Sequence, residues 1–315
     1  MQTLDTLDLG DADALIIVPP FAASDCPSLA AHLLQACAAQ RGLREHLIPA
    51  RRDQRPLSVH LAQDLVWLLL ETGLKSVVIL TWMRLVAEIY NEHLRAFSVQ
   101  AMQDLPVALR IAAGVLLADL IGWFQHWLRH KIPWLWEFHK IHHAQPRINL
   151  FTDARLHIVD WTAATTIRYV LMLMLGVPPV ESMYFALIAD WYTRAYHANL
   201  RTNLGPLRYL LVSPQFHRVH HSIEEAHRDK NFAVLFPVWD HLFGTKSPDD
   251  HEYPETGVAD PHFPPEPTSF GLGLLTTPLV QMVYPFRAIA AKLRLPSIIL
   301  RARARVRVKE GTPEA

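Results

Sequence analysis

Residues 119–143 read DLIGWFQHWLRHKIPWLWEFHKIHH, and residues 216–221 return to the same pattern with FHRVHH. Both stretches contain His-x-x-His-His, with the histidines at His139, His142 and His143 and again at His217, His220 and His221. Residues three and four apart on a helix share a face, so each copy directs at least two imidazoles towards one point. Neutral imidazole is a common ligand of transition metals. The repeated pattern therefore predicts helices that converge on a metal site.

Three more histidines extend this pattern. His126 and His130 are four residues apart just before the first copy, and His197 stands between the two copies. Nine imidazoles can saturate two metal ions and leave room for an oxygen-derived ligand, so we predict a dinuclear, all-nitrogen site. The other nine of the chain's 18 histidines are scattered and show no such spacing.

Composition excludes several classes of protein. The formal net charge of the 315-residue chain is zero and its pI is about 7.3, so no global field attracts nucleic acid and we expect no nucleic-acid partner. Cys26 and Cys37 are the only cysteines. They form no C-x-x-C, which argues against a disulfide framework, a zinc ribbon and an iron–sulfur site. The first residues are polar and acidic, so no cleaved signal peptide is predicted.

Hydropathy points to a membrane protein. Half of the residues are apolar and the mean hydropathy is +0.10. Stretches near the minimum length for a membrane span cover residues 65–83, 107–124, 161–176 and 179–195. The second stretch continues helically to His130, and the last two form a hairpin around the break at residues 176–179. We expect an all-α integral membrane protein with about four transmembrane helices, the alternative being a soluble helical protein with buried helices.

The charges of the loops orient these spans. Lys and Arg gather before the first span (residues 41–55), after the second (129–155) and after the fourth (201–230). By the positive-inside rule these segments are cytoplasmic. Both histidine-rich halves then lie on one side, as a cytoplasmic helical cap whose metal site faces the cytoplasm at the inner (cytoplasmic) membrane.

We divide the chain into three parts. Residues 1–60 are predicted to be a cytoplasmic N-terminal appendage with a short βα unit over residues 12–39. Residues 61–250 form the membrane-embedded catalytic domain. Residues 251–315 contain a Pro-rich loop, an interfacial helix over residues 271–286 that Pro278 breaks, and a basic tail.

Longer motifs around the histidines resemble a known family. The chain carries Asp119 seven residues before His126, and later the runs HANL (197–200), NLGPL (203–207), SPQFHRVHH (213–221), DKNF (229–232) and WDHLFGT (239–245). Over residues 65–246 these motifs resemble the fatty acid hydroxylase/sterol desaturase superfamily, most closely its bacterial sterol-desaturase-like and alkylglycerol monooxygenase branch.

The resemblance implies an integral membrane enzyme with a non-haem diiron centre that uses O2 to hydroxylate or desaturate a lipid C–H bond. Its cofactors would be two iron ions. Electrons would come from NAD(P)H through a separate carrier, either a cytochrome b5-like protein or a ferredoxin/reductase. The implied catalytic metal ligands are His126, His130, His139, His142, His143, His197, His217, His220 and His221.

Four other residues are assigned around these ligands. Many relatives carry Arg-x-His-Pro-x-Glu where this chain has Arg155-Leu-His157-Ile158-Val-Asp160, which leaves open whether His157 is a tenth ligand. We place Asp119, Asn231 and Asp240 behind the ligands. A carboxylate at the depth of Asp119 is costly in hydrocarbon, so it either accepts an imidazole N–H or a buried arginine, or makes a purely structural hydrogen bond.

Two other classes of protein remain possible. A zinc-dependent lipid hydrolase also uses imidazole, but nine histidines exceed its usual needs and hydrolysis recruits a carboxylate base. A non-enzymatic metal transporter or sensor would need ligands at mid-membrane depth, whereas these histidines fall at span ends. Neither the lipid substrate nor the choice between hydroxylation and desaturation follows from the residues.

Overall fold

The computed structural model describes residues 49–54, 57–248 and 251–310, and every regular element within them is helical apart from one isolated bridge between Ser222 and Thr256. The α-helices are α2 (Val59–Ile89), α3 (Val107–Lys131), α4 (Pro133–His143), α5 (Ile158–Met174), α6 (Pro179–Tyr196), α7 (Pro214–His220), α8 (Val238–Leu242) and α9 (Gly273–Glu310). Short 3-10 or π turns are η2 (Tyr90–Leu94), η3 (Arg95–Phe97), η4 (Thr152–Ala154), η5 (Gly205–Tyr209) and η6 (Glu225–His227). The prediction of a mainly helical chain is confirmed for these residues, while the predicted βα unit at residues 12–39 lies outside them.

The two His-x-x-His-His motifs lie on short helices with the same kind of start. α4 follows the extended residue Ile132 and has Pro133 at its first position, and α7 has Pro214 there. Proline suits this position because its missing N–H would be unpaired in any case. Ser213 caps α7 by accepting a hydrogen bond at Oγ from the Phe216 N–H at 3.1 Å. Proline and serine thus specify where the ligand-bearing helices begin.

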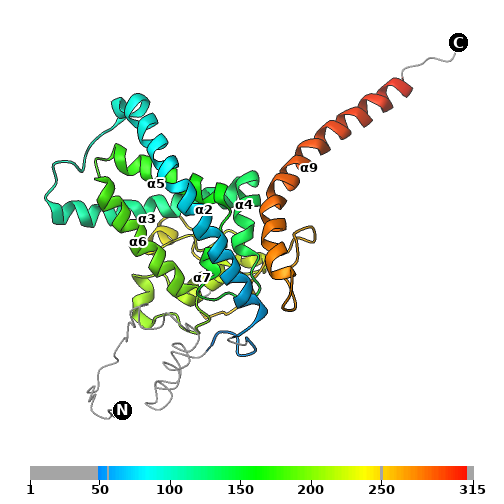
Figure 1. The fold of residues 1–315 in the computed structure, drawn as a ribbon, viewed down its shortest axis with the longest axis horizontal. Helices are drawn as coiled ribbons and strands as arrows, with labels where there is room; N and C mark the ends of the chain where they lie inside the picture. Colours follow the sequence, from blue (N-terminus) through cyan, green and yellow to red (C-terminus); the bar gives the residue numbers. More distant parts are fainter. Residues whose placement is uncertain (1–48, 55–56, 249–250, 311–315) are drawn as a thin grey trace, which may run out of the picture.

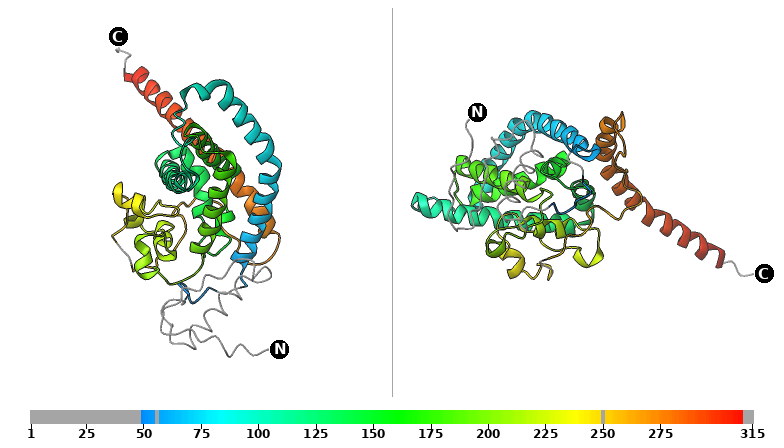
Figure 2. Two further views of the ribbon diagram at one scale, coloured as in Figure 1. Left: turned by 90° about the vertical axis from the view of Figure 1, so that its left-hand side faces the viewer. Right: turned by 90° about the horizontal axis from the view of Figure 1, so that it is seen from below.

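α3 is the central helix, because it packs against α4, α5 and α6 (Figures 1 and 2). Its C-terminal half shares a core with α6, α7 and the segment after α7. The buried members of this core are Trp123, Tyr196, Val212, Phe216, Phe232 and Ala233. This core brings segments more than 100 residues apart to one end of α3.

The predicted spans correspond to helices, but not all of them meet the requirements for a membrane crossing. Among the described residues α3 alone is long and apolar enough, and the bent pair Val59–Ile79 and Thr81–Phe97, with a 44° bend, would count as a second span or a re-entrant loop. α5 has 17 residues, and α6 contains three charged residues. The number of four spans therefore stays a prediction.

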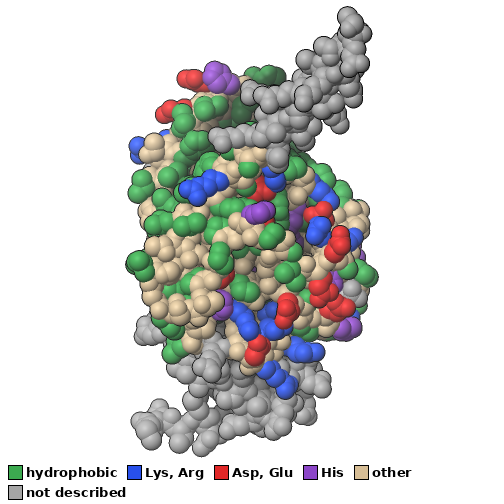
Figure 3. Space-filling view, turned by 90° about the vertical axis from the view of Figure 1, so that its right-hand side faces the viewer, with side chains coloured by type: hydrophobic (Ala, Val, Ile, Leu, Met, Phe, Trp, Pro, Cys, Tyr) green, Lys and Arg blue, Asp and Glu red, His purple; other side chains and the backbone are tan. Residues whose placement is uncertain are grey.

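Apolar side chains remain exposed along these helices. Leu69 and Val77 of α2 are 74% and 77% exposed, and Ile188 of α6 and Leu279 of α9 are 56% and 54% exposed. Figure 3 shows hydrophobic side chains spread over one face of the molecule. Exposed apolar surface of this extent is typical of a protein that contacts a membrane or another protein.

The C-terminal part differs from the prediction. Pro278 does not break the helix, because α9 continues from Gly273 to Glu310 and extends away from the rest of the structure (Figure 1). A proline removes one backbone hydrogen bond, which a long helix can tolerate with a local bend. The basic tail is thus part of α9.

Two glycines test the packing of the long helices. A Cβ at Gly114 of α3 would lie 2.6 Å from Cε2 of Phe185 in α6, whereas a Cβ at Gly73 of α2 would meet nothing within 4 Å. We expect Gly114→Ala to destabilise the protein by about 1–3 kcal/mol through overpacking. Gly73→Ala should be neutral or stabilising by up to about 1 kcal/mol because alanine favours helix. Denaturant unfolding in detergent measures both, and equal effects would contradict the close contact of α3 with α6.

Candidate metal centre

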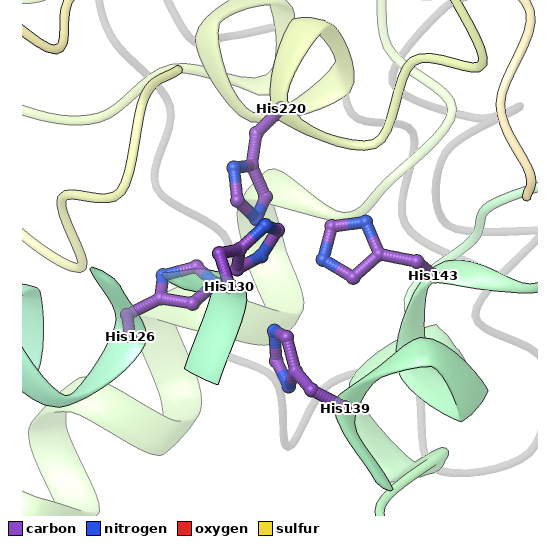
Figure 4. A group of neighbouring side chains, drawn as sticks. All are labelled: His126, His130, His139, His143 and His220. Atoms are coloured by element: carbon purple, nitrogen blue, oxygen red, sulfur yellow. The ribbon is translucent and has the colours of Figure 1, made fainter. Parts of the chain in front are cut away.

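The nine predicted histidines lie together at one end of α3 in two groups. The first group contains His126, His130, His139, His143 and His220, and the second contains His142, His197, His217 and His221. Within each group the nitrogens that could bind an ion all lie within 4.8 Å of one another. Figure 4 shows the five rings of the first group around a common space. All nine side chains are buried.

Each His-x-x-His-His motif contributes to both groups. The first motif gives two histidines to the first group and one to the second, and the second motif gives one and two. Adjacent residues on a helix point about 100° apart, so His142 and His143 face different centres. The two groups adjoin, since the rings of His143 and His221 stack with centroids 4.3 Å apart. The geometry therefore provides two neighbouring centres.

The nitrogens of the first group fit a cation. In each of the five histidines of the first group, the Nε2 atom has no hydrogen-bond partner. Buried polar atoms are nearly always paired, so five unpaired nitrogens around one space indicate a missing partner. A metal ion bound by their lone pairs satisfies all five.

The second group has a related arrangement. Nε2 of His217 lies 2.8 Å from Nε2 of His197 and 2.9 Å from Nε2 of His221, and His142 Nε2 lies 3.4 Å from His197 Nε2. A neutral imidazole has one donor and one acceptor nitrogen, so these four atoms cannot all be satisfied by one another. Their convergence suits a second cation.

Oxygen acceptors orient the rings of the first group. Nδ1 of His126 donates to the Phe232 carbonyl at 2.8 Å, and Nδ1 of His220 donates to the Lys230 carbonyl at 2.7 Å. Nδ1 of His139 donates to Oδ2 of Asp160 at 3.0 Å. Because an oxygen acceptor places the proton on Nδ1, the lone pair of Nε2 is free for a metal. In the second group His197 Nδ1 faces the Thr193 carbonyl at 2.6 Å.

One short segment, residues 229–233, contacts the rings of three histidines in the first group. It supplies the two carbonyls that accept from His126 and His220, and Asp229 Oδ1 lies 3.7 Å from Nδ1 of His130. Asn231 lies between the two carbonyls in the left-handed region, with φ of 60°. With this backbone conformation at Asn231, the carbonyls of Lys230 and Phe232 on either side of it both face the first group.

The predicted supporting residues hold this segment and do not contact the rings. Asn231 accepts the Ser247 N–H at 2.7 Å and donates to the Phe216 carbonyl of α7 at 3.0 Å. Asp240 accepts the N–H groups of Phe232 and Ala233 at 2.9 and 2.7 Å. These bonds fix the position of the carbonyl that orients His126.

The Asp119 carboxylate accepts hydrogen bonds from three protein groups. It accepts the N–H groups of Leu235 and Phe236 at 2.7 and 3.0 Å and Nε1–H of Trp239 at 2.9 Å. All three donors lie in the segment after α7. Asp119 thus ties that segment to α3.

His157 lies in neither group. Its Nδ1 accepts the Val159 N–H at 3.0 Å as the N-cap of α5, and Nε2 lies 3.0 Å from the Met282 carbonyl of α9. With both nitrogens engaged, His157 joins α5 to α9. The residue that reaches the centre from this motif is Asp160, which also accepts a hydrogen bond from Nη1 of Arg129 at 3.2 Å. Sequence reasoning noted Asp160 as a departure from the relatives' glutamate and missed its contact with His139.

Burial keeps the imidazoles neutral. It lowers the pKa of His142, His143, His217, His220 and His221 well below the ordinary value of 6.5, and the neighbouring histidines add to the shift. A neutral ring is the form that binds a metal.

These pKa shifts predict acid sensitivity of the metal-free protein. Between pH 6.5 and the lower folded pKa values, the unfolded chain binds protons that the folded chain does not, so stability falls as pH falls. Each such histidine contributes up to about 1.4 kcal/mol per pH unit. Thermal unfolding of the metal-free protein should show a loss of stability below about pH 6.5 and none from these groups above it. A stability that stays constant down to about pH 5 would contradict the burial of neutral rings.

The Asp160 contact predicts a selective loss of metal affinity. Asp160→Asn removes the charge that orients His139, and we expect affinity at the first group to fall about 10–100-fold. Chelator competition measures this affinity, with the second group as an internal reference. The matched control is His157→Gln in the same motif, which should leave both affinities unchanged. A large loss in the control would place His157 among the ligands.

Known proteins resemble the part of the chain that carries this centre. The family described as fatty acid hydroxylase matches residues 111–245, which include all nine histidines. An ornithine lipid hydroxylase of Rhizobium tropici is 26% identical over 185 residues, which are 58% of this chain and 51% of that protein. The alkylglycerol monooxygenase of Danio rerio is 33% identical over 129 residues, which are 40% of this chain and 28% of that protein.

A third relative has a similar coverage. The cholesterol 25-hydroxylase of Homo sapiens is 28% identical over 134 residues, which are 42% of this chain and 48% of that protein. The alignment thus spans about half of the ornithine lipid hydroxylase and about a quarter of the alkylglycerol monooxygenase. No solved structure matches the chain significantly. The resemblance read from the motifs is confirmed, since residues 111–245 of the chain match the fatty acid hydroxylase family.

Proposed function

We propose that this protein is a membrane-bound non-haem diiron oxygenase that hydroxylates or desaturates a lipid C–H bond with O2 and externally supplied electrons. The observation that carries the proposal is the sorting of nine buried imidazoles into two adjacent groups of five and four. The names of the relatives, which are hydroxylases and monooxygenases, support the same reaction type. Because the names of these relatives refer to lipids, the proposed substrate class is a lipid.

The first ion would be held by the group of five histidines and the second by the group of four. When bound, a pair of iron ions supplies the redox chemistry with O2 that removes hydrogen from an unactivated C–H bond. Hydroxylation adds one oxygen atom to the lipid and reduces the other to water, which consumes electrons and protons. An electron carrier of the cytochrome b5 or ferredoxin type, reduced by NAD(P)H, would supply the electrons.

The chain's own residues would orient the ligands and exclude water. Asp160 and the carbonyls of Lys230 and Phe232 hold the rings in the tautomer that presents Nε2. Trp136 packs beside His130 and His143 with ring centroids 4.8 and 5.3 Å away. These aromatic contacts cover the first group from one side and limit the access of water.

The proposed place of the centre is the membrane surface. His126 and His130 lie in the last two turns of α3, the helix that is long and apolar enough to cross a bilayer. A centre at this helix end can meet a lipid chain without carrying nine polar rings into hydrocarbon. The basic loops predict that this surface is the cytoplasmic one.

Metal content tests the proposal directly. Protein made in iron-supplemented cells should contain about two irons per chain, because each of the two histidine groups can hold one ion. His220→Ala should remove the ion of the first group, and His217→Ala that of the second, so each variant should keep about one iron and lose turnover. Iron analysis of the purified variants and lipid analysis for added oxygen or a new double bond give the two readouts.

The control is His262→Ala, which removes an exposed histidine outside both groups and should keep metal and turnover. Full activity with two bound metals in His220→Ala would show that the ligand assignment is wrong. Zinc as the only metal, with no O2 consumed on reduction, would favour the lipid hydrolase or a non-catalytic role instead.

A further inference from the structure

A small cavity adjoins the metal centre. It lies between α3, α5 and α6 under residues 234–235 and has a volume of about 40 Å³. Its lining is apolar except for three side chains, which are Asp119, Gln125 and Arg168. Three polar groups in one apolar cavity are the usual composition of a ligand site.

The cavity continues the helix face that carries the first histidine group. Asp119 and Gly122 of α3 line it, and His126 lies seven and four residues further on, on the same face. Four helical residues span about 6 Å. From the other side, the lining residue Val234 comes two residues after Phe232, whose carbonyl accepts from His126. A molecule in the cavity would therefore lie about one helical turn from the first group.

Two of the three polar side chains are not satisfied by the protein. Asp119 has its three donors, but Oε1 of Gln125 has no hydrogen-bond partner although the residue is only 6% exposed. In the described part of the chain, the Arg168 guanidinium makes no hydrogen bond and no ion pair. Asp190 of α6 attracts Arg168 electrostatically without forming a salt bridge. The Arg168 guanidinium is half-buried at the edge of this apolar cavity and therefore favours a negative partner. Oε1 of Gln125 can only accept, so it needs a hydrogen-bond donor.

We propose that this cavity binds the anionic oxygen group of a lipid, with Arg168 paired to its carboxylate or phosphate oxygens and the Gln125 amide as a second polar contact. The inference rests on the proposed function in one respect, namely that the bound lipid is the substrate of the adjoining centre. Arg168 is then a specificity-determining residue, because its charge selects lipids with an acidic head over neutral ones.

The test measures binding to the full-length, metal-free protein in neutral detergent. The probes are palmitate, lysophosphatidate and, as a neutral match, methyl palmitate. We expect both anionic probes to bind about tenfold or more tightly than the ester, and Arg168→Gln to remove this preference while it leaves ester binding unchanged. Arg168→Lys should keep part of the preference because the charge remains.

The matched control is Arg84→Gln, which removes an exposed arginine of α2 that does not line the cavity and should keep the full preference. Equal binding of palmitate and its methyl ester, or an unchanged preference in Arg168→Gln, would overturn the proposal. Inorganic phosphate that competes as well as lysophosphatidate would also overturn it, since the site would then recognise a free anion. Because no metal is present, this result is separate from the iron analysis, and either proposal can fail alone.

Discussion

The structure depends on one constraint, which is the burial of nine neutral imidazoles with their free nitrogens aimed at two points. Burying an unpaired polar nitrogen is costly, so an ion or a donor at each point would stabilise the arrangement. The protein meets this constraint with rigid short elements. Two Pro-started helices, α4 and α7, place six of the rings, and the ends of α3 and α6 place the other three.

Layers of hydrogen bonds around the rings follow from the same constraint. A carbonyl or a carboxylate holds Nδ1 of His126, His139 and His220, and a further layer holds those acceptors. Asp240 and Asp119 each accept hydrogen bonds from two backbone N–H groups of the segment after α7. Because the acceptors come from backbone as well as side chains, loss of one outer residue shifts a carbonyl and, through it, a ring.

A second buried network connects the remaining helices to this centre. The guanidinium of Arg155, which is fully buried, pairs with Asp64 of α2 and makes two hydrogen bonds to Glu266, at 2.7 and 2.9 Å. Asp64 also accepts from Gln145, two residues after the last histidine of α4. Breaking such a pair leaves an uncompensated charge, which typically costs about 3–5 kcal/mol. The loop over residues 251–272 is therefore bound to the part of the chain that carries the centre, although the sequence suggested a separate C-terminal region.

Local patterns were enough to predict the helical class, the course of α3 to His130, the hairpin of α5 and α6, and the nine histidines that converge. Each of these follows from spacing along the chain, because helix faces and proline starts act over a few residues. Only the tertiary structure shows the division into groups of five and four, the position of Asp160 and not His157 beside His139, and the three donors from which Asp119 accepts. These depend on partners such as His126 and Phe232, which are 106 residues apart and whose contact no local pattern encodes. The packing of α3, α5 and α6 likewise leaves Arg168 without a hydrogen bond or an ion pair among the described residues. The sequence shows which residues are charged, but not which of them form ion pairs.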